Sequence, residues 1–293
     1  MISLVTWNIQ YGRGRDDRVD LERQADLLRP FDIIGLQEVE RFWRRTGEVD
    51  QVARLAELLP DHYHVYGPAT DILKQHGPGP KGAVRRQFGN AVFSRFPILI
   101  ANSVTLPRRA AMGIPTSARI ALDTILELPS GRHLRFCSTH LDHAQADLRL
   151  EQADALLRLY REAALSGGIS HGAAGRDHPW WGEEIQAPPV PPDMVLVGDF
   201  NLTPKEPAYA RLVGACDPHF GRVAHLDGFA DAWTLSGHAE EEGMTWWDDP
   251  QVAPRRLDYV LVTAGLAPLV RSCRILPGDL SDHQPVAVEL ELD

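Results

Sequence analysis

Polar side chains at the ends of apolar, strand-like runs carry the chemistry of this sequence. A run of strand character next to Asn, Glu, Asp or His is how a sheet delivers polar groups to one rim. The residues placed in this way are Asn8, Glu38, His140, Asp199, Asn201, Asp258, Asp282 and His283. Carboxylate and amide oxygens without thiolates suit a hard cation such as Mg²⁺ or Mn²⁺, and the imidazoles are available as proton or charge partners. The pattern predicts a metal site at one edge of a sheet.

Each of these residues, taken alone, also has an ordinary structural explanation. Asn8 could close a turn after a strand, and Asp258 could pair with Arg255 or Arg256 at the surface. Each explanation can account for one residue, but together they do not account for the whole set. The other histidines, His143 among them, share no spacing, and we assign them to the surface or to loops.

The elements that must position these groups alternate between strand and helix, which predicts an α/β protein with mixed sheets. Apolar residues recur with helical spacing in some segments, and continuous or alternating apolar runs mark others as strands. Helices are expected at 19–28, 49–59 and 144–164, and strands at 2–8, 32–37, 117–128 and 133–138, the last two forming a hairpin around the turn PSGR.

The chain of 293 residues is expected to form a single domain, because large α/β enzymes reach this length without splitting. A segment at about 166–193 is rich in Gly, Pro, His and Trp and loses all periodicity. So long an irregular insertion is typical of a lid or binding loop, and a solvent-facing disordered insertion is the alternative.

Charge and cysteine content limit the possible partners and compartment. A formal net charge of −10 disfavours a protein that holds duplex nucleic acid mainly through phosphate neutralisation, although it leaves nuclease chemistry open. The three cysteines have no CxxC pairing, so neither a disulfide framework nor a thiolate zinc site is predicted. The first residues enter a strand at once, and we expect a cytoplasmic protein without an export signal.

Seven motifs in order resemble the endonuclease/exonuclease/phosphatase superfamily, which includes DNase I-like nucleases, inositol polyphosphate 5-phosphatases and sphingomyelinases. They are TWNIQYG, LQEVE, FGNAVFSRFPI, STHLDH, GDFNLTP, LDYVLV and SDHQPV. The resemblance implies a four-layer α/β sandwich, with two packed mixed sheets flanked by helices and a site at one rim. It also implies a hydrolase that acts on phosphate ester bonds with Mg²⁺ or Mn²⁺.

The same resemblance assigns roles to individual residues. Asn8 and Glu38 match the metal-binding Asn and Glu, and Asp282 matches a third acidic residue at or near the metal. Asp199 and Asn201 resemble the pair that positions or deprotonates the attacking water. The remaining catalytic matches are His283 against the scissile phosphate, Asp258 as the carboxylate that holds it, and His140 as the histidine that stabilises charge on the phosphoryl oxygens.

Two further residues, Arg119 in SARIALDTIL and Asn90 in FGNAVF, are the substrate-binding candidates. Gln10 stands where some nuclease members carry an acidic residue, so we expect one metal rather than two.

The sequence therefore predicts a metal-dependent phosphoesterase that uses water to hydrolyse a small or lipid-like phosphoester. A nuclease is the alternative, and it would need a basic groove around 41–45, 81–86 and 108–109. A catalytically silent binding module with the same fold is the third possibility, but the chemical competence of all seven motifs opposes it.

Overall fold

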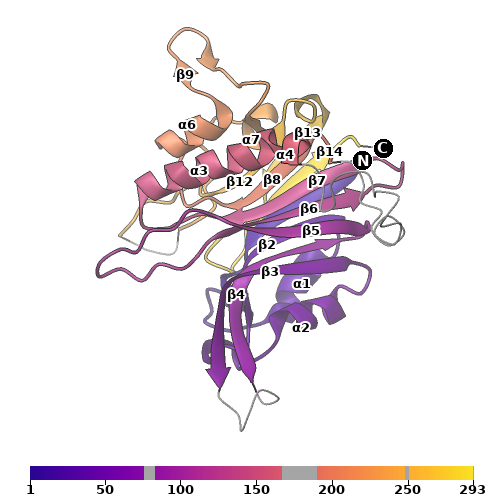
Figure 1. Ribbon diagram of the computed structural model, residues 1–293, viewed down its shortest axis with the longest axis vertical. Coiled ribbons are helices and arrows are strands. Elements are labelled where there is room, and N and C mark those ends of the chain that lie inside the picture. The colour runs from indigo at the N-terminus through magenta and orange to yellow at the C-terminus, as the bar shows by residue number, and fades with distance from the viewer. Residues whose placement is uncertain (76–82, 167–189, 248–250, 293) are drawn as a thin grey trace, which may run out of the picture.

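Two six-stranded mixed sheets pack face to face in the computed structural model, which describes residues 1–75, 83–166, 190–247 and 251–292 (Figure 1). The first sheet has the order β13-β14-β1-β2-β4-β3, and the second has the order β11-β12-β8-β7-β6-β5. β1 and β2 are parallel, as are β7 and β8, and the other neighbours are antiparallel. Most of the predicted insertion at about 166–193 lies outside the described residues.

The strands of the first sheet are β1 (Ile2–Asn8), β2 (Ile33–Arg41), β3 (Tyr63–Gln75), β4 (Val84–Ser94), β13 (Val270–Ile275) and β14 (Val286–Leu290). Those of the second are β5 (Ile98–Thr105), β6 (Ile120–Glu127), β7 (His133–His140), β8 (Met194–Asp199), β11 (Phe229–Asp231) and β12 (Asp258–Thr263). A short pair, β9 (Cys216–Asp217) and β10 (Gly221–Arg222), stands apart. The helices are α1 (Leu21–Leu28), α2 (Gln51–Leu58), α3 (Ala146–Arg161), α4 (Ala163–Ser166), α6 (Pro207–Val213) and α7 (Ala232–Leu235), with 3-10 turns η1 (Gln10–Gly12), η2 (Arg44–Thr46) and η4 (Ala267–Leu269).

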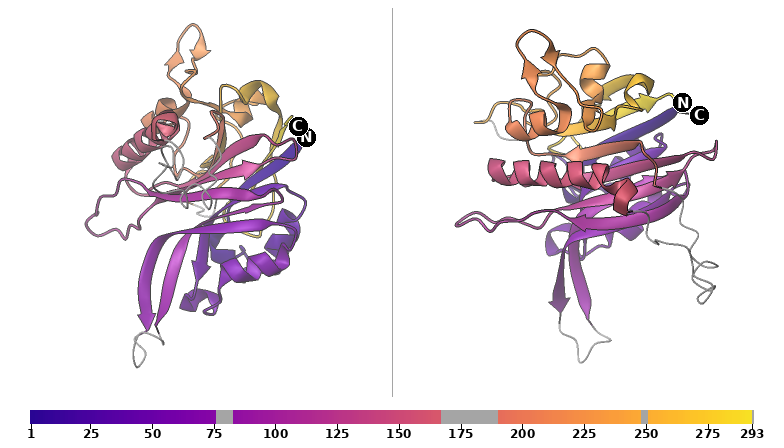
Figure 2. Two further views of the ribbon diagram at one scale, coloured as in Figure 1. Left: turned by 45° about the vertical axis from the view of Figure 1, so that its right-hand side comes forward. Right: turned by 45° about the horizontal axis from the view of Figure 1, so that its top comes forward.

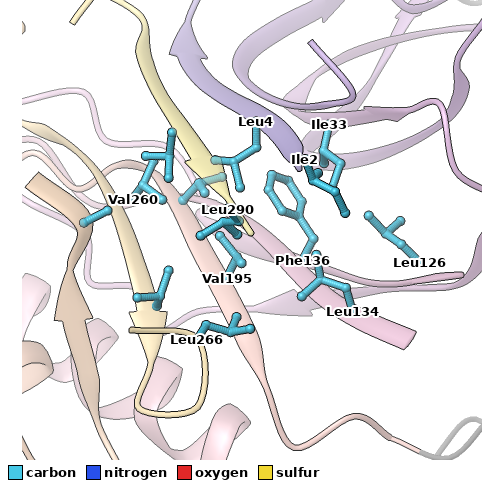
Figure 3. Close-up of a cluster of buried hydrophobic side chains, with 14 of the residues drawn as sticks. Ile2, Leu4, Ile33, Leu126, Leu134, Phe136, Val195, Val260, Leu266 and Leu290 are labelled. Atoms are coloured by element: carbon cyan, nitrogen blue, oxygen red, sulfur yellow. The ribbon is translucent and has the colours of Figure 1, made fainter. Parts of the chain in front are cut away.

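Three apolar clusters separate four layers, which confirms the predicted sandwich. The central cluster joins the inner faces of the two sheets, with Leu4, Phe136, Val195 and Val260 among its members (Figure 3). A second cluster packs α3 and α6 on the outer face of the second sheet, and a third packs α1 and α2 on the outer face of the first. Figures 1 and 2 show these helices on opposite sides of the paired sheets.

The predicted helices at 19–28, 49–59 and 144–164 correspond to α1, α2 and α3. The side chains of Asp20 and Asp50 accept hydrogen bonds from the first free N–H groups of α1 and α2, which explains where each helix begins. The predicted hairpin is confirmed as β6 and β7, which pair antiparallel across the PSGR turn. None of the helices in the described parts of the chain is long and apolar enough to cross a membrane, and all three cysteines are free thiols.

Candidate active site at the rim of the two sheets

The two-residue period of the strands explains why polar side chains from both sheets meet. On β1, Leu4 belongs to the core between the sheets, and Asn8 lies four residues further on the same face. The same parity relates Phe136 to His140 on β7 and Val197 to Asp199 on β8. Asp258 begins β12 directly opposite Asp199, with Val260 behind it in the core. The apolar filling therefore ends, and the polar site begins, at one rim between the sheets.

A layer of neutral polar groups lies between this rim and the core. Gln37 Nε2 reaches across from the first sheet to Ser138 Oγ on the second at 3.0 Å, and it contacts Thr6 Oγ1 at 3.2 Å. All three side chains are fully buried. Because buried polar groups are stabilised only when they are paired, this layer fixes the separation of the sheets beneath the site.

Glu38 reaches the rim because the backbone of β2 departs from regular strand geometry. The register with β4 shifts between Leu36 and Val39, and Glu38 itself has φ +61°. A non-glycine residue in this region is strained, and such strain is concentrated at functional sites. Asn201 has φ +51°, and it turns the chain directly after β8. Both irregularities redirect polar side chains that a regular strand would place elsewhere.

Asp199 is the centre of the site. Its Oδ2 accepts a hydrogen bond from Asn8 Nδ2 at 3.0 Å and lies 3.4 Å from His140 Nε2 and 3.7 Å from His283 Nε2. Its Oδ1 accepts from the backbone N–H of Asn201 at 2.9 Å. Burial, opposed by the charge of His283, raises the pKa of Asp199 above its ordinary value. The carboxylate is thus oriented by four residues from four different segments, and its basicity is increased.

His283 and Asp258 form a charged pair. His283 Nδ1 donates to Asp258 Oδ2 at 2.8 Å, and the backbone carbonyl of His283 accepts from Trp7 Nε1 at 2.9 Å. Burial disfavours the protonated imidazole, but the charges of Asp258 and Asp199 outweigh burial and raise the pKa of His283 to about 10. His283 is therefore an imidazolium at neutral pH, with Nε2–H directed toward Asp199.

His140 has the opposite protonation state. Burial, together with the positive charges of Arg119 and His283, holds the pKa of His140 well below its ordinary value. No hydrogen-bond partner among the described residues reaches its buried Nδ1. A neutral imidazole thus lies beside a charged one at the same carboxylate. Of these two imidazoles, only that of His140 can both donate and accept a proton at neutral pH.

Glu38 and Asp282 are the candidate metal ligands that face one another. Burial and the neighbouring charge of Asp282 raise the pKa of Glu38 to about 7, although Asn8 Nδ2 approaches its Oε1 at 3.3 Å. The two carboxylates repel one another, and a bound cation would relieve this repulsion. Hard oxygen donors of this kind are the ligands that Mg²⁺ prefers. The residues present therefore fit a divalent cation, with Asn8 Oδ1 partly engaged by the backbone N–H of Gln10 at 3.0 Å.

A second group could also approach a metal, because ligand atoms of Asp199, Asp258 and His283 all lie within 4.8 Å of one another. However, His283 uses Nδ1 on Asp258 and is held protonated, which leaves no lone pair for a metal. The arrangement of these three is suited to proton and charge handling.

Arg119 enters the site from the chain segment that precedes β6. Burial lowers its pKa, while the charges of Glu38 and Asp199 oppose this shift. Its Nη2 lies 3.3 Å from His143 Nδ1, and its Nε has no partner among the described residues. Asn90 is also buried, but its Nδ2 donates to the carbonyl of Ser138 at 3.1 Å. Arg119 thus offers free donors to an anion, whereas the Asn90 amide nitrogen already bridges to β7.

A model of the endonuclease/exonuclease/phosphatase family matches residues 5–283, a span that includes every site residue described above. The chain belongs to this family. Members of the endonuclease/exonuclease/phosphatase family are hydrolases of phosphate esters. No curated protein matches the chain significantly.

Solved structures of the family share the fold with this chain at low sequence identity. An endonuclease/exonuclease/phosphatase from Bacteroides vulgatus is 20% identical, with a TM-score of 0.67 over 100% of this chain and 99% of its own. A mannosyl-6-phosphatase from Bacteroides thetaiotaomicron is 19% identical, with a TM-score of 0.63 over the whole of both chains. The human Nocturnin catalytic domain with bound sulfate is 21% identical, with a TM-score of 0.62 over 98% of this chain and 93% of its own.

Sequence reasoning overlooked one residue at this family site. His143 was assigned to the surface or to loops because the histidines share no common spacing, and it is indeed exposed. Its contact with Arg119 nevertheless brings it to the edge of the site. The available signal was position: His143 follows His140 by three residues, where β7 has ended and α3 has not yet begun.

Proposed function

We propose that this chain is a metal-dependent phosphoesterase that hydrolyses the phosphate ester of a small or lipid-like molecule by attack of water. The observation that carries the proposal is the convergence of Asn8, His140 and His283 on Asp199. One oriented carboxylate between a neutral and a charged imidazole is an arrangement suited to activating water next to an anion.

In this proposal Asp199 positions the attacking water and takes its proton. The raised pKa of Asp199 suits this role, because a stronger base removes a proton more readily near neutral pH. The backbone N–H of Asn201 binds Oδ1 and Asn8 Nδ2 binds Oδ2, so both oxygens of the carboxylate have fixed directions. Orientation of this carboxylate is the main contribution of this part of the site.

The cationic groups receive the phosphate. His283, an imidazolium held by Asp258, donates Nε2–H to a phosphoryl oxygen. Arg119 donates its unpaired guanidinium N–H groups to another, and neutral His140 adds a hydrogen bond without adding charge. These fixed donors lie in a desolvated rim, where they stabilise the developing charge more strongly than water does. Asn90 contributes indirectly, because its hydrogen bond to the carbonyl of Ser138 joins β4 to β7.

One Mg²⁺ or Mn²⁺ held by Glu38, Asp282 and Asn8 would supply a positive charge against the phosphoryl oxygens. Glu38 must be deprotonated to serve as a ligand, and its pKa near 7 makes metal binding favourable above neutral pH.

A small substrate is favoured over a nucleic acid because several basic side chains among the described residues of the expected groove are already paired. Arg41 binds Asp50 at 2.6 Å, Arg45 binds Glu40, and Arg85 binds Asp71 at 2.6 Å. Arginines engaged in this way do not release phosphate counterions on binding a polyanion. The similarity over full length to a mannosyl-6-phosphatase agrees with a small substrate.

A substrate panel tests the proposal. Bis-p-nitrophenyl phosphate, p-nitrophenyl phosphate, a phospholipid and plasmid DNA are each incubated with the purified chain and Mg²⁺, Mn²⁺ or EDTA. We expect metal-dependent hydrolysis of a small or lipid ester that EDTA abolishes. Plasmid cleavage that far exceeds the small esters would establish the nuclease instead, and no hydrolysis under any condition would establish the silent binding module.

A further inference from the structure

A hollow of about 340 Å³ lies beside the Arg119 edge of the site, and none of the roles above uses it. Residues 108–110 and 116–118 form its walls together with Asp142 and the first turns of α3, and Arg108, Arg109, Thr116 and Ser117 are among the lining residues. In Figure 1 the segment joining β5 to β6 extends beyond the sheet near α3. We call this cavity the Arg108 hollow.

The Arg108 hollow adjoins the phosphate-binding groups through the chain itself. Its wall includes Ala118, which directly precedes Arg119, and Asp142, which directly precedes His143. Arg119 Nη2 and His143 Nδ1 lie 3.3 Å apart between them. The hollow therefore begins within one residue of both Arg119 and His143 along the chain.

Hydrogen bonds hold the wall of the hollow in place. Gln152 Nε2 on α3 donates to the carbonyl of Pro107 at 2.9 Å, and Gln152 Oε1 accepts from the backbone N–H of Asp142 at 2.9 Å. Asp142 Oδ1 in turn accepts from the backbone N–H groups of Ala144 and Gln145 at 2.9 and 2.8 Å. The polar groups of this side are thus committed to holding the segment against α3.

The charged groups that line the hollow, Arg108, Arg109 and Asp142, are engaged to different extents. The two neighbouring arginines differ, because Arg109 is paired with Asp147 and Glu151 on α3. Across the described residues, Arg108 makes no ion pair, and the hydroxyls of Thr116 and Ser117 make no hydrogen bond. One free guanidinium and two free hydroxyls facing a cavity form a donor set suited to an anionic oxygen group.

We propose that the Arg108 hollow is a subsite for the non-reacting part of the substrate and that it binds a second anionic group, a carboxylate or a phosphate. Its volume is near the lower end for small-molecule sites, which limits the occupant to about the size of a sugar or a short acid. The inference rests on the proposed function and defines its substrate class as phosphoesters with two anionic groups.

Two matched substrate pairs and two neighbouring variants test the subsite. 3-Phosphoglycerate is compared with glycerol 3-phosphate, and fructose 1,6-bisphosphate with fructose 6-phosphate, so that each pair differs in the second anionic group. Arg108→Gln removes the free guanidinium. Arg109→Gln is the control, since it removes a lining arginine whose charge is already paired at the surface.

We expect the wild-type protein to prefer the doubly anionic member of at least one pair, and R108Q to reduce that preference about tenfold, mainly through KM. R109Q should leave the preference unchanged. Preference for a carboxylate or a phosphate identifies which anion the hollow takes. Equal effects of the two substitutions, or none from R108Q on an active enzyme, would overturn the subsite while the phosphoesterase stands.

Binding separates failure of the subsite from failure of the catalytic proposal. If the wild-type chain hydrolyses none of these esters, p-nitrophenyl phosphate included, the phosphoesterase proposal fails. Calorimetric titration of 3-phosphoglycerate and glycerol 3-phosphate then tests the hollow directly. Tighter binding of 3-phosphoglycerate that R108Q alone weakens would support the subsite, and equal or absent binding of the two would reject it.

Discussion

Two buried arginines lie in or beside the second sheet, and only one of them has a carboxylate partner. Arg135 on β7 is 3% exposed and binds Asp123 on β6 through two nitrogens, Nε to Oδ1 at 2.8 Å and Nη2 to Oδ2 at 2.7 Å. Arg119 is 5% exposed and has no carboxylate within ion-pair distance among the described residues. A buried cation with a fixed partner holds the fold, whereas one without a partner is ready for an anionic ligand.

The acidic residues show the same contrast. Asp231 accepts from Arg256 Nη1 at 2.6 Å and from the Tyr209 hydroxyl at 2.8 Å, and all three side chains are buried. The pKa of Glu38 is instead raised, first by burial and then by the neighbouring charge of Asp282. The compensated groups behave as core, and the uncompensated groups collect at the rim. Substitutions in the two classes should therefore separate activity from stability.

The largest effect is expected at Asp199. Asp199→Ala removes both the water-positioning oxygen and the base, so activity should fall by about 10³-fold or more. Because the pKa of this carboxylate is raised by burial, the variant should be as stable as the wild type or more stable. Initial rates on the best substrate of the panel, with thermal unfolding measured in parallel, check both statements.

Asp61→Ala, at an exposed position in the turn between α2 and β3, is the matched control and should change neither quantity. A loss of activity below tenfold in Asp199→Ala would remove Asp199 from the role of base.

Substitution of the paired arginine should lower stability, and substitution of the arginine without a carboxylate partner should lower activity. Arg135→Met leaves Asp123 buried without a partner and should destabilise the protein by about 3 to 5 kcal/mol, with normal activity in the folded fraction. Arg119→Met should leave stability within about 1 kcal/mol, because no buried carboxylate loses a partner and His143 is exposed to water, while activity falls about 10²-fold. Urea unfolding and steady-state kinetics on both variants measure the exchange.

The double variant Arg135→Met with Asp123→Leu should recover most of the stability lost in Arg135→Met, because no buried charge remains. If Arg119→Met destabilised the protein as much as Arg135→Met, the distinction between the two arginines would be wrong.

The sequence predicted only part of this arrangement. The predictable part is the set of residues whose face follows from the two-residue period of a strand. Asn8, His140 and Asp199 follow core residues at even spacing on strands, so their common face could be read from a two-residue period. Glu38 lies on the rim through a register shift and a positive φ, which depend on how β2 pairs with β4. Its location agrees with the motif, but its geometry could not be derived from the local sequence.

Pairing between distant charges was also beyond the sequence. Asp258 could have bonded to Arg255 or Arg256, yet Arg256 lies against Asp231 and Asp258 binds His283. These choices arise only when β12 and the segment before β14 are packed together. The basic clusters looked available for the same reason, since their acidic partners, Asp50 for Arg41 among them, come from other elements of the fold.

The charged imidazole should set the basic limit of activity. His283 is protonated up to a pKa of about 10, so kcat/KM should fall only as pH approaches that value. Asp258→Asn removes the charge that raises this pKa, and the basic limb should move toward neutral pH by one unit or more, about 1.4 kcal/mol of interaction. Rates from pH 6 to 10 give the shift.

The same pair has a stability signature. Because the folded pKa of His283 is raised, its stabilising contribution is complete below the ordinary value near 6.5 and is lost as pH rises through about 10. Asp258→Asn should therefore destabilise the protein at pH 7 and have little effect near pH 11. An unchanged basic limb in this variant would show that a different group governs it.

The smallest effect is expected at Glu38, where removal of an uncompensated charge should stabilise the protein. Its folded pKa of about 7 exceeds the ordinary 4.5, so the stability associated with the neutral form is complete below pH 4.5 and is lost as pH rises through 7. Glu38→Gln keeps the neutral form at every pH. In EDTA at pH 8 it should be more stable than the wild type by about 1 to 3 kcal/mol, and the two should converge near pH 4.5.

Metal should reverse this difference, because a divalent cation would offset the negative charge of the buried Glu38 carboxylate. Mg²⁺ at pH 8 should raise the melting temperature of the wild-type protein and leave Glu38→Gln nearly unchanged. Glu40→Gln is the nearby control, since Glu40 is already paired with Arg45 and should retain the full response to Mg²⁺. A wild-type protein that is more stable than Glu38→Gln in EDTA at pH 8 would contradict the inference that burial disfavours the Glu38 carboxylate and raises its pKa.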